Sequence, residues 1–147
     1  MGAELHRKKW MGLLAKSKPV ELAELWQSLG AKPDFDWLRR PEIGGVMVRG
    51  RQGGTGAPFN LGEMTVTRSS VALKSGEVGH GYVQGRDKAH CQIAALVDAL
   101  MQTDMALDVD RTVLEPLRKS LDARKGARKA RADATRVNFF TMVRGED

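Results

Sequence analysis

The spacing of apolar residues predicts two helices at the beginning of the chain. Over residues 3–16, apolar side chains recur at the three- and four-residue intervals of one helix face, with lysines between them. A second helix is expected over residues 19–29, because Pro19 suits the first turn of a helix and Gly30 suits the position just past its end. The short connection makes the pair a helical hairpin.

The middle of the chain has the pattern of an antiparallel sheet. Eleven of the sixteen glycines fall within residues 42–85, and short β-like runs lie between them. Ser75 and Gly76 are typical of a two-residue hairpin turn. We therefore predict a small sheet over residues 43–84, preceded by an extended or turned segment at residues 34–41. Its strands are expected at residues 43–51, 61–74 and 77–84.

The last third of the chain returns to a helical pattern. Asp87 is expected to cap a helix over residues 87–105, in which apolar residues again recur at helical spacing. Residues 104–110 are expected to form a loop. Because Pro116 would disrupt the interior of a long helix, the next helix, which is strongly basic, is expected only over residues 115–134.

An apolar tail at residues 136–144 follows the basic helix and must pack on this domain or on a neighbouring chain. Together these elements predict an α+β fold: an N-terminal helical hairpin, a small antiparallel sheet and C-terminal helices, in one domain over residues 1–147. Only 5% of the residues are aromatic, so the core is thin and help from a partner subunit is expected. An isolated chain is expected to self-associate through its tail and strand edges.

The net charge of +6 and a pI near 9.8 favour anionic partners without choosing among them. The basic stretch at residues 118–131 suits nucleic-acid phosphates, an acidic protein or a solvated face, and its lack of aromatic residues does not favour nucleic acid. With Cys91 as the one cysteine and three histidines, neither a disulfide nor a metal site is expected. Without a signal peptide or a membrane-spanning run, we expect a cytoplasmic location and no membrane partner.

Glycines and arginines gather within residues 48–68. Arg49 and Arg51 share one face of a predicted strand, and the glycines beside them allow backbone amides to converge on an anion. Neither the P-loop pattern nor the dinucleotide fingerprint matches, and the alternative is a hairpin in which the glycines serve geometry alone. The residues predicted to bind an anion or to form an interface are Arg49, Arg51, Gly53, Gly54, Thr55, Gly56, Asn60 and Arg68.

Two further residues are candidates for catalysis by proton transfer. Glu63 and His80 fall on adjacent predicted strands, where a carboxylate and an imidazole can act as a pair. The alternatives are that His80 is an ordinary surface or interface residue and that Glu63 pairs with an arginine. The residues alone therefore assign no catalytic group.

Three blocks of sequence occur in a fixed order: RRPEIGGVMVRGRQGGTGAPFNLGEMTVTRSSVAL, then GHGYVQGRDKAHCQIAALVDALMQ, then TRVNFFTMVRGED. They resemble the G subunit family of the bacterial carbon–phosphorus lyase core complex. The resemblance runs from about residue 40 to the C-terminus, and the N-terminal helices fit it too. Gly45 departs from the pattern, because a larger apolar residue is expected there, and this affects packing more than chemistry.

The resemblance implies a role in phosphonate breakdown as a subunit of a transferase complex that is inactive as a lone chain. In that family the G subunit joins the H, I and J subunits. With the nucleosidase-like I subunit, H and an ATP-binding-cassette-like L protein, it supports displacement of adenine from ATP by methylphosphonate. The J subunit performs the later radical step. The resemblance implies no cofactor on this chain and assigns it no catalytic residue. A non-catalytic scaffold and a stand-alone anion- or RNA-binding module are the alternatives.

Overall fold

The computed structural model describes the backbone of residues 2–51 and 56–145, and the side chains of residues 6–51, 56–59 and 61–135. Contacts within the chain define two compact units, Met1–Leu117 and Arg118–Asp147. The first unit holds the sheet and the helices that pack on it, and the second is most of one helix. Helices together with an antiparallel sheet confirm the predicted α+β class. The single domain over residues 1–147 stays a prediction.

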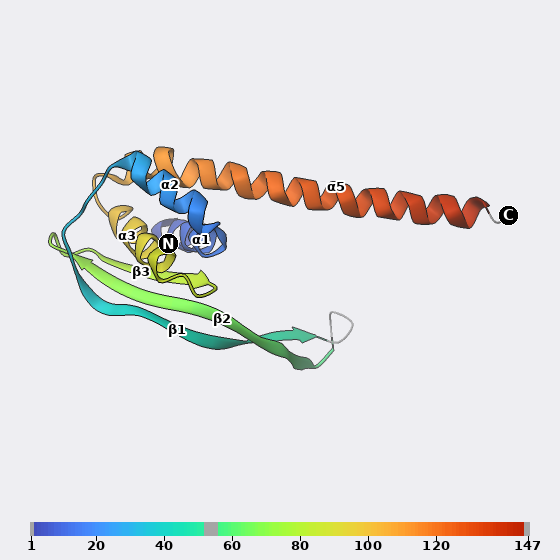
Figure 1. The fold of residues 1–147 in the computed structure, drawn as a ribbon, viewed down its shortest axis with the longest axis horizontal. Coiled ribbons are helices and arrows are strands. Elements are labelled where there is room, and N and C mark those ends of the chain that lie inside the picture. Colours follow the sequence, from blue (N-terminus) through green and yellow to red (C-terminus); the bar gives the residue numbers. More distant parts are fainter. Residues whose placement is uncertain (1, 52–55, 146–147) are drawn as a thin grey trace. The chain divides into compact units, whose positions relative to one another are not determined.

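The two predicted N-terminal helices are confirmed as α1 (Gly2–Lys16) and α2 (Pro19–Leu29). Pro19 occupies the first turn of α2, and Gly30, with φ of 69°, lets its N–H bond back to the last turn. Both helices pack against α3 (Lys88–Leu100), and α1 also contacts the sheet (Figure 1). The hairpin therefore contacts both α3 and the sheet.

The sheet has three antiparallel strands in the order β1 (Phe35–Arg51), β2 (Pro58–Leu73) and β3 (Val78–Gln84). The three predicted strands are confirmed, but β1 begins well before residue 43 and takes in most of residues 34–41. Shifts in the pairing register between Trp37 and Glu42 let the strand carry Pro41, which has no N–H for the ladder.

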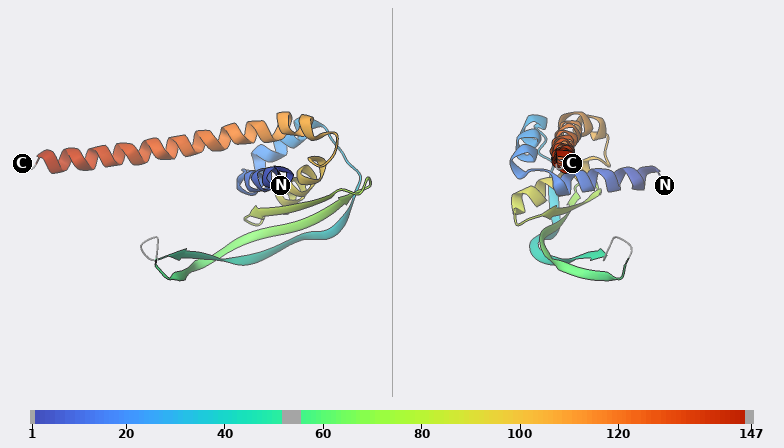
Figure 2. Two further views of the ribbon diagram at one scale, coloured as in Figure 1. Left: turned by 180° about the vertical axis from the view of Figure 1, so that it is seen from behind. Right: turned by 90° about the vertical axis from the view of Figure 1, so that its right-hand side faces the viewer.

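Helix α3 covers one face of β2 and β3 (Figures 1 and 2). Asp87 caps it as predicted, because its carboxylate accepts an N–H of the first turn at 2.9 Å. Two glycines of β3 allow the close approach of helix and sheet. A Cβ at Gly79 would lie 2.0 Å from the carbonyl oxygen of Ala95, and one at Gly81 would lie 2.3 Å from that of Cys91. Any side chain at these positions would push α3 off the sheet.

The predicted helix over residues 87–105 is too long. The helix ends at Leu100, where the Thr103 hydroxyl donates to its last carbonyl at 2.6 Å and accepts the N–H of Met105 at 3.1 Å. These two bonds satisfy groups that a continuing helix would have paired, so the chain turns there.

The prediction of a loop at residues 104–110 is wrong in its second half. The structure has α4 (Ala106–Val109) and a π-helical turn, η2 (Asp110–Leu114), and α5 (Glu115–Gly145) follows without a break. Pro116 has no N–H to donate to the carbonyl four residues earlier. The wider turn immediately before it accommodates that loss, so helical structure runs from Ala106 through Pro116, whereas the sequence predicted a helix only from residue 115.

The second unit consists of α5 from Arg118 onward, with basic and small side chains. The helix begins at Glu115 as predicted but continues to Gly145, past the predicted end at 134 and through the backbone of the tail at residues 136–144. Side chains of residues 125–135 are all exposed. Alanine, arginine and lysine favour helix without burial. The tail side chains lie outside the described residues, so their packing stays a prediction.

Beyond the end of β3, β1 and β2 continue as a pair (Figure 1). Gln84, the last residue of β3, lies opposite Val66 of β2, and Val66 lies opposite Gly44 of β1. Past this row only two strands remain. We call residues 45–51 and 58–65 the two-stranded ribbon.

Candidate functional site

The predicted anion-binding turn lies largely outside the described residues. Gly53, Gly54 and Thr55 are not described, nor is the side chain of Asn60, although its backbone belongs to β2. Gly56 is described and is half-buried. An anion cradle in this turn therefore stays a prediction.

The structure separates the three arginines of the predicted set. Arg49 lies opposite Asn60 on the ribbon, whereas Arg68 lies opposite Glu42. The two positions are eight residues apart along β2, or about 26 Å at ~3.3 Å per residue. Arg49 and Arg51 are both exposed on the ribbon. The three guanidinium groups thus do not converge on one anion.

The structure also separates Glu63 from His80. His80 pairs with Ser70 on β2, seven residues from Glu63, or about 23 Å along the strand. Glu63 lies on the ribbon, where its carboxylate reaches across Gly45: a Cβ at Gly45 would lie 1.7 Å from a carboxylate oxygen of Glu63. Proton transfer between the two candidates is therefore excluded in this chain, and the small residue at position 45 makes room for Glu63.

His80 is held at two points on the open face of the sheet. Its backbone N–H donates to Asp98 at 2.8 Å, and its ring Nδ1 lies 2.8 Å from the Ser70 hydroxyl. The exposed imidazole is therefore oriented with Nε2 away from Ser70. Two rows along the sheet, Arg68 pairs with Tyr82, so Arg68 and His80 share the face that α3 leaves uncovered. Diagonal neighbours of this kind are about 7–8 Å apart.

One buried charge with several hydrogen-bond partners was not predicted from the sequence. Asp98 on α3 is fully buried, and its carboxylate accepts hydrogen bonds from Arg7 at 2.8 and 3.1 Å, from Trp10 Nε1 at 2.8 Å and from the His80 N–H. The hydrogen bonds to Asp98 raise the pKa of Arg7. Arg7 also donates to the carbonyl of Val78 at 3.2 Å. This cluster joins α1, α3 and the outer edge of β3, and it sets the backbone position of His80.

A second buried pair joins the end of α1 to the first turn of α3. The Ser17 hydroxyl donates to the carbonyl of Leu14 at 2.7 Å and lies 2.9 Å from His90 Nε2. Because the one hydroxyl proton is used on Leu14, the ring must donate, which assigns the proton to Nε2 and leaves Nδ1 bare. Nδ1 is buried with no partner among the described atoms, and burial lowers the pKa of His90. The Ser17–His90 pair therefore has a structural role, because it joins α1 to α3.

Three further kinds of site were considered in the described part of the chain: a metal site, a membrane-spanning helix and a reactive cysteine. There, no three His, Cys, Asp or Glu side chains are grouped so as to hold a metal ion, and no helix is both long and apolar enough to cross a membrane. Cys91 is fully buried, its Sγ lies 3.0 Å from the Ser69 hydroxyl, and burial raises the pKa of its thiol. A buried thiol of this kind is inert as a nucleophile.

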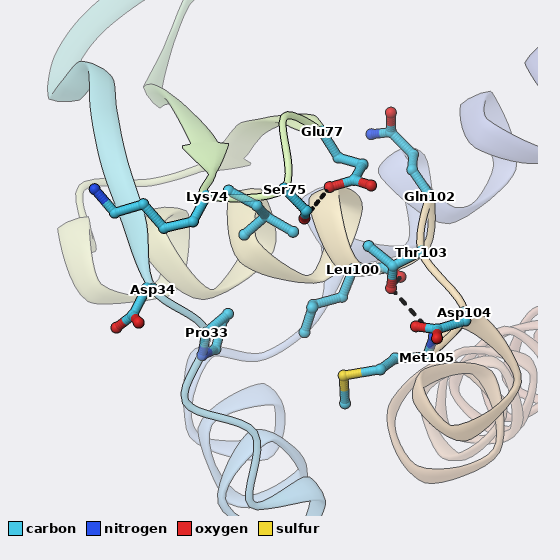
Figure 3. A pocket seen from close by; sticks show the side chains of 11 residues that line it. Pro33, Asp34, Lys74, Ser75, Glu77, Leu100, Gln102, Thr103, Asp104 and Met105 are labelled. Carbon is cyan, nitrogen blue, oxygen red and sulfur yellow. Dashed lines mark hydrogen bonds between the residues drawn. The ribbon is translucent and has the colours of Figure 1, made fainter.

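A hollow of about 650 Å³ lies between the turn that joins β2 to β3 and the C-terminal end of α3 (Figure 3). Three carboxylates line it, those of Asp34, Glu77 and Asp104, against the single ammonium of Lys74. Lys74 is already paired with Asp36 at 3.0 Å. The C-terminal end of a helix adds negative potential. This hollow repels a triphosphate.

A second hollow, of about 580 Å³, lies between α1 and Tyr82 of β3. Its lining is mostly apolar, with Met11 and Ala15 from α1. Two cations also line it: Arg7, whose guanidinium is already bound to Asp98, and Lys8 of α1. It suits an apolar side chain better than a phosphate.

Comparison with known proteins identifies the family. The profile of the family described as phosphonate metabolism protein PhnG matches residues 5–145. The α-D-ribose 1-methylphosphonate 5-triphosphate synthase subunit PhnG of Rhizobium meliloti (strain 1021) is 47% identical over 141 residues, which cover 96% of this chain and 90% of the relative. The two matches span the helices, the sheet and the long helix alike. The chain therefore belongs to the PhnG family of phosphonate metabolism proteins.

Proposed function

We propose that this chain is a subunit of a synthase that makes α-D-ribose 1-methylphosphonate 5-triphosphate from ATP and methylphosphonate. The observation that carries the proposal is the 47% identity, over almost the whole of both chains, to a relative of that name. In the reaction a phosphonate oxygen bonds to C1 of the ribose, the bond from C1 to adenine breaks, and adenine leaves with a proton. The partners are the I, H, J and L subunits, and ATP is a substrate of the complex. The transfer takes place in the cytoplasm.

Within that complex we assign this chain an assembling role, and the lone chain has no activity. Three observations support this. Glu63 and His80 lie too far apart to act together. The polar hollow repels a triphosphate, and the lining of the second hollow is mostly apolar. Arg49 and Arg51 are both exposed on the ribbon, where a partner can contact them.

One observation favours a second candidate, a contribution to an active site shared with another subunit. Asp98 and Ser70 hold His80 from two sides, and Arg68 stands on the same open face. A pre-oriented imidazole beside a guanidinium suits a phosphate or phosphonate group, provided that a partner closes the site.

Growth on methylphosphonate tests the proposal and separates the two roles. A host without its own copy of this gene should grow on phosphate but not on methylphosphonate as its sole phosphorus source, and this chain should restore growth. If the R68Q and H80Q variants assemble normally and restore growth, the scaffold role holds. If they assemble but do not restore growth, the shared site holds. Growth on methylphosphonate without the chain would contradict the proposed function.

A further inference from the structure

The two-stranded ribbon lacks the support that the rest of the sheet has. From Gly44 back toward Phe35, β1 pairs with the part of β2 that β3 and α3 support, whereas residues 45–51 pair with a part of β2 that lies beyond the end of β3. Two strands alone are marginally stable in water, and a third strand or a packed helix is needed for independent stability. The ribbon is therefore the part of the sheet that most needs a partner.

Large apolar side chains stand exposed on both faces of this region. Ile43 and Met47 lie four residues apart and so share a face of β1, with 45% and 55% of their surface exposed. Leu61 is 62% exposed and lies against Gly50 on the opposite face, since a Cβ at Gly50 would be 3.0 Å from it. Phe59, opposite Gly50, is 42% exposed. Apolar surface on both faces indicates insertion into another protein rather than contact on one side.

The outer edge of β1 is protected in one half and open in the other. Between Trp37 and Glu42 the strand carries two register shifts, Pro41 and exposed arginines, devices that prevent strand-to-strand pairing. From residue 42 to residue 48 the pairing with β2 is unbroken. Within the described chain no strand pairs with the outer edge of this stretch. An unpaired, regular edge is the template for another strand.

We propose that residues 42–48 of β1 receive an extended segment of a partner subunit as the next strand of the sheet. The open edge specifies a strand, and the exposed Ile43 and Met47 on one face of β1 specify apolar residues on the same face of the incoming segment. Arg49 and Arg51 are exposed at the end of this stretch and form no ion pair with any described residue, so carboxylates follow the apolar positions in the partner. A net charge of +6 opposes a second copy of this chain as the occupant. The inference rests on the proposed function for the assembly in which the partner occurs.

Residue-resolved amide exchange distinguishes strand addition from side-chain packing. In the purified complex with the co-expressed partner subunits, every second amide of residues 42–48 should exchange at least about tenfold more slowly than in the isolated chain, because only alternate N–H groups point to the outer edge. Unchanged exchange of these amides in the complex overturns the proposal. So does protection confined to residues 59–63 of β2, and so does protection that appears in the isolated chain as its concentration rises.

Variants provide the second measurement. M47D places a carboxylate on the exposed apolar face and should weaken association with the partner subunits at least about tenfold. L107D, on Leu107 of α4, which is 72% exposed, is the control and should assemble as the wild type does. Equal association of both variants contradicts the proposal. Adenine release by the wild-type complex is measured in the same preparations, so a failed interface and a failed function are told apart.

Discussion

The carboxylate of Asp98 holds α1, α3 and β3 together, and replacing it with an amide tests how much this cluster stabilises the first unit. Asp98 is fully buried and accepts four hydrogen bonds, two from Arg7 and one each from Trp10 and the His80 backbone. Asp98→Asn keeps the shape of the side chain. It removes the charge and turns one of the two acceptor oxygens into a donor.

The expected loss of stability follows from the number of N–H donors that lose their acceptor in the variant. Whichever way the amide is turned, its NH₂ group faces two N–H donors, so about two hydrogen bonds are lost, one of them to the charged Arg7. A hydrogen bond to a charged group contributes ~1.5–3 kcal/mol, and an orphaned buried donor costs ~1–3 kcal/mol. The Arg7 side chain is 32% exposed and regains part of its hydration in the variant, so the loss of stability should lie at the lower end of the range that these contributions add up to. We expect the free energy of unfolding to fall by about 3 kcal/mol.

Urea denaturation followed by tryptophan fluorescence measures this loss. The three tryptophans, Trp10, Trp26 and Trp37, lie in the first unit, so the signal reports that unit alone. With a urea dependence of about 2 kcal/mol per molar, the midpoint should drop by about 1.5 M. Asp104→Asn, an exposed aspartate just after α3, is the control and should shift the midpoint by less than about 0.3 M. If D98N behaves like this control, the reasoning about the cluster is refuted.

Three further predictions follow from buried groups and close approaches. The free energy of unfolding should decrease as pH falls below about 6.5, because burial lowers the pKa of His90 and the unfolded chain therefore takes up the proton first. Urea denaturation at pH 7.5 and at pH 5 measures this decrease. It should be smaller in H90Q than in an H80Q control. Gly79→Ala should lower the free energy of unfolding by about 3 kcal/mol, because its Cβ would lie 2.0 Å from the Ala95 carbonyl oxygen. In Gly126→Ala, in α5, the added Cβ meets nothing within 4 Å and should stabilise the helix by about 0.5–1 kcal/mol. A G79A chain as stable as G126A would show that α3 moves to accommodate the new side chain. The Cys91 thiol should react with a maleimide at the rate at which the first unit opens, and a fast reaction in the native chain would contradict its burial.

Local patterns predicted the elements well where local chemistry decides them. Pro19 and Gly30 delimit α2, and Asp87 caps α3, because these residues act through their own backbone or first-turn partners. The effect of Pro116 could not be predicted in this way. How much a proline destabilises a helix depends on the width of the turn before it, and here a π-helical turn accommodates the missing hydrogen bond.

The candidate site was harder to predict, because it depends on register between distant segments. Glu63, His80, Arg49 and Arg68 occupy strands as expected, but a pairing offset of a few residues decides whether side chains meet, and composition does not carry that offset. The Asp98 cluster left one signal in the sequence: an aspartate within an otherwise apolar stretch of helix. Its partner Arg7 lies 91 residues earlier in the chain, among other basic residues of α1. Nothing in the sequence therefore marks Arg7 as the partner of Asp98.

The central claim is that this chain contributes to adenine displacement only as part of an assembly. Adenine formed from ATP and methylphosphonate is measured in three samples: the complete set of subunits, the same set without this chain, and this chain alone. The account predicts adenine from the complete set and none from the other two. Adenine release at the full rate without this chain, or from the chain alone, would contradict it.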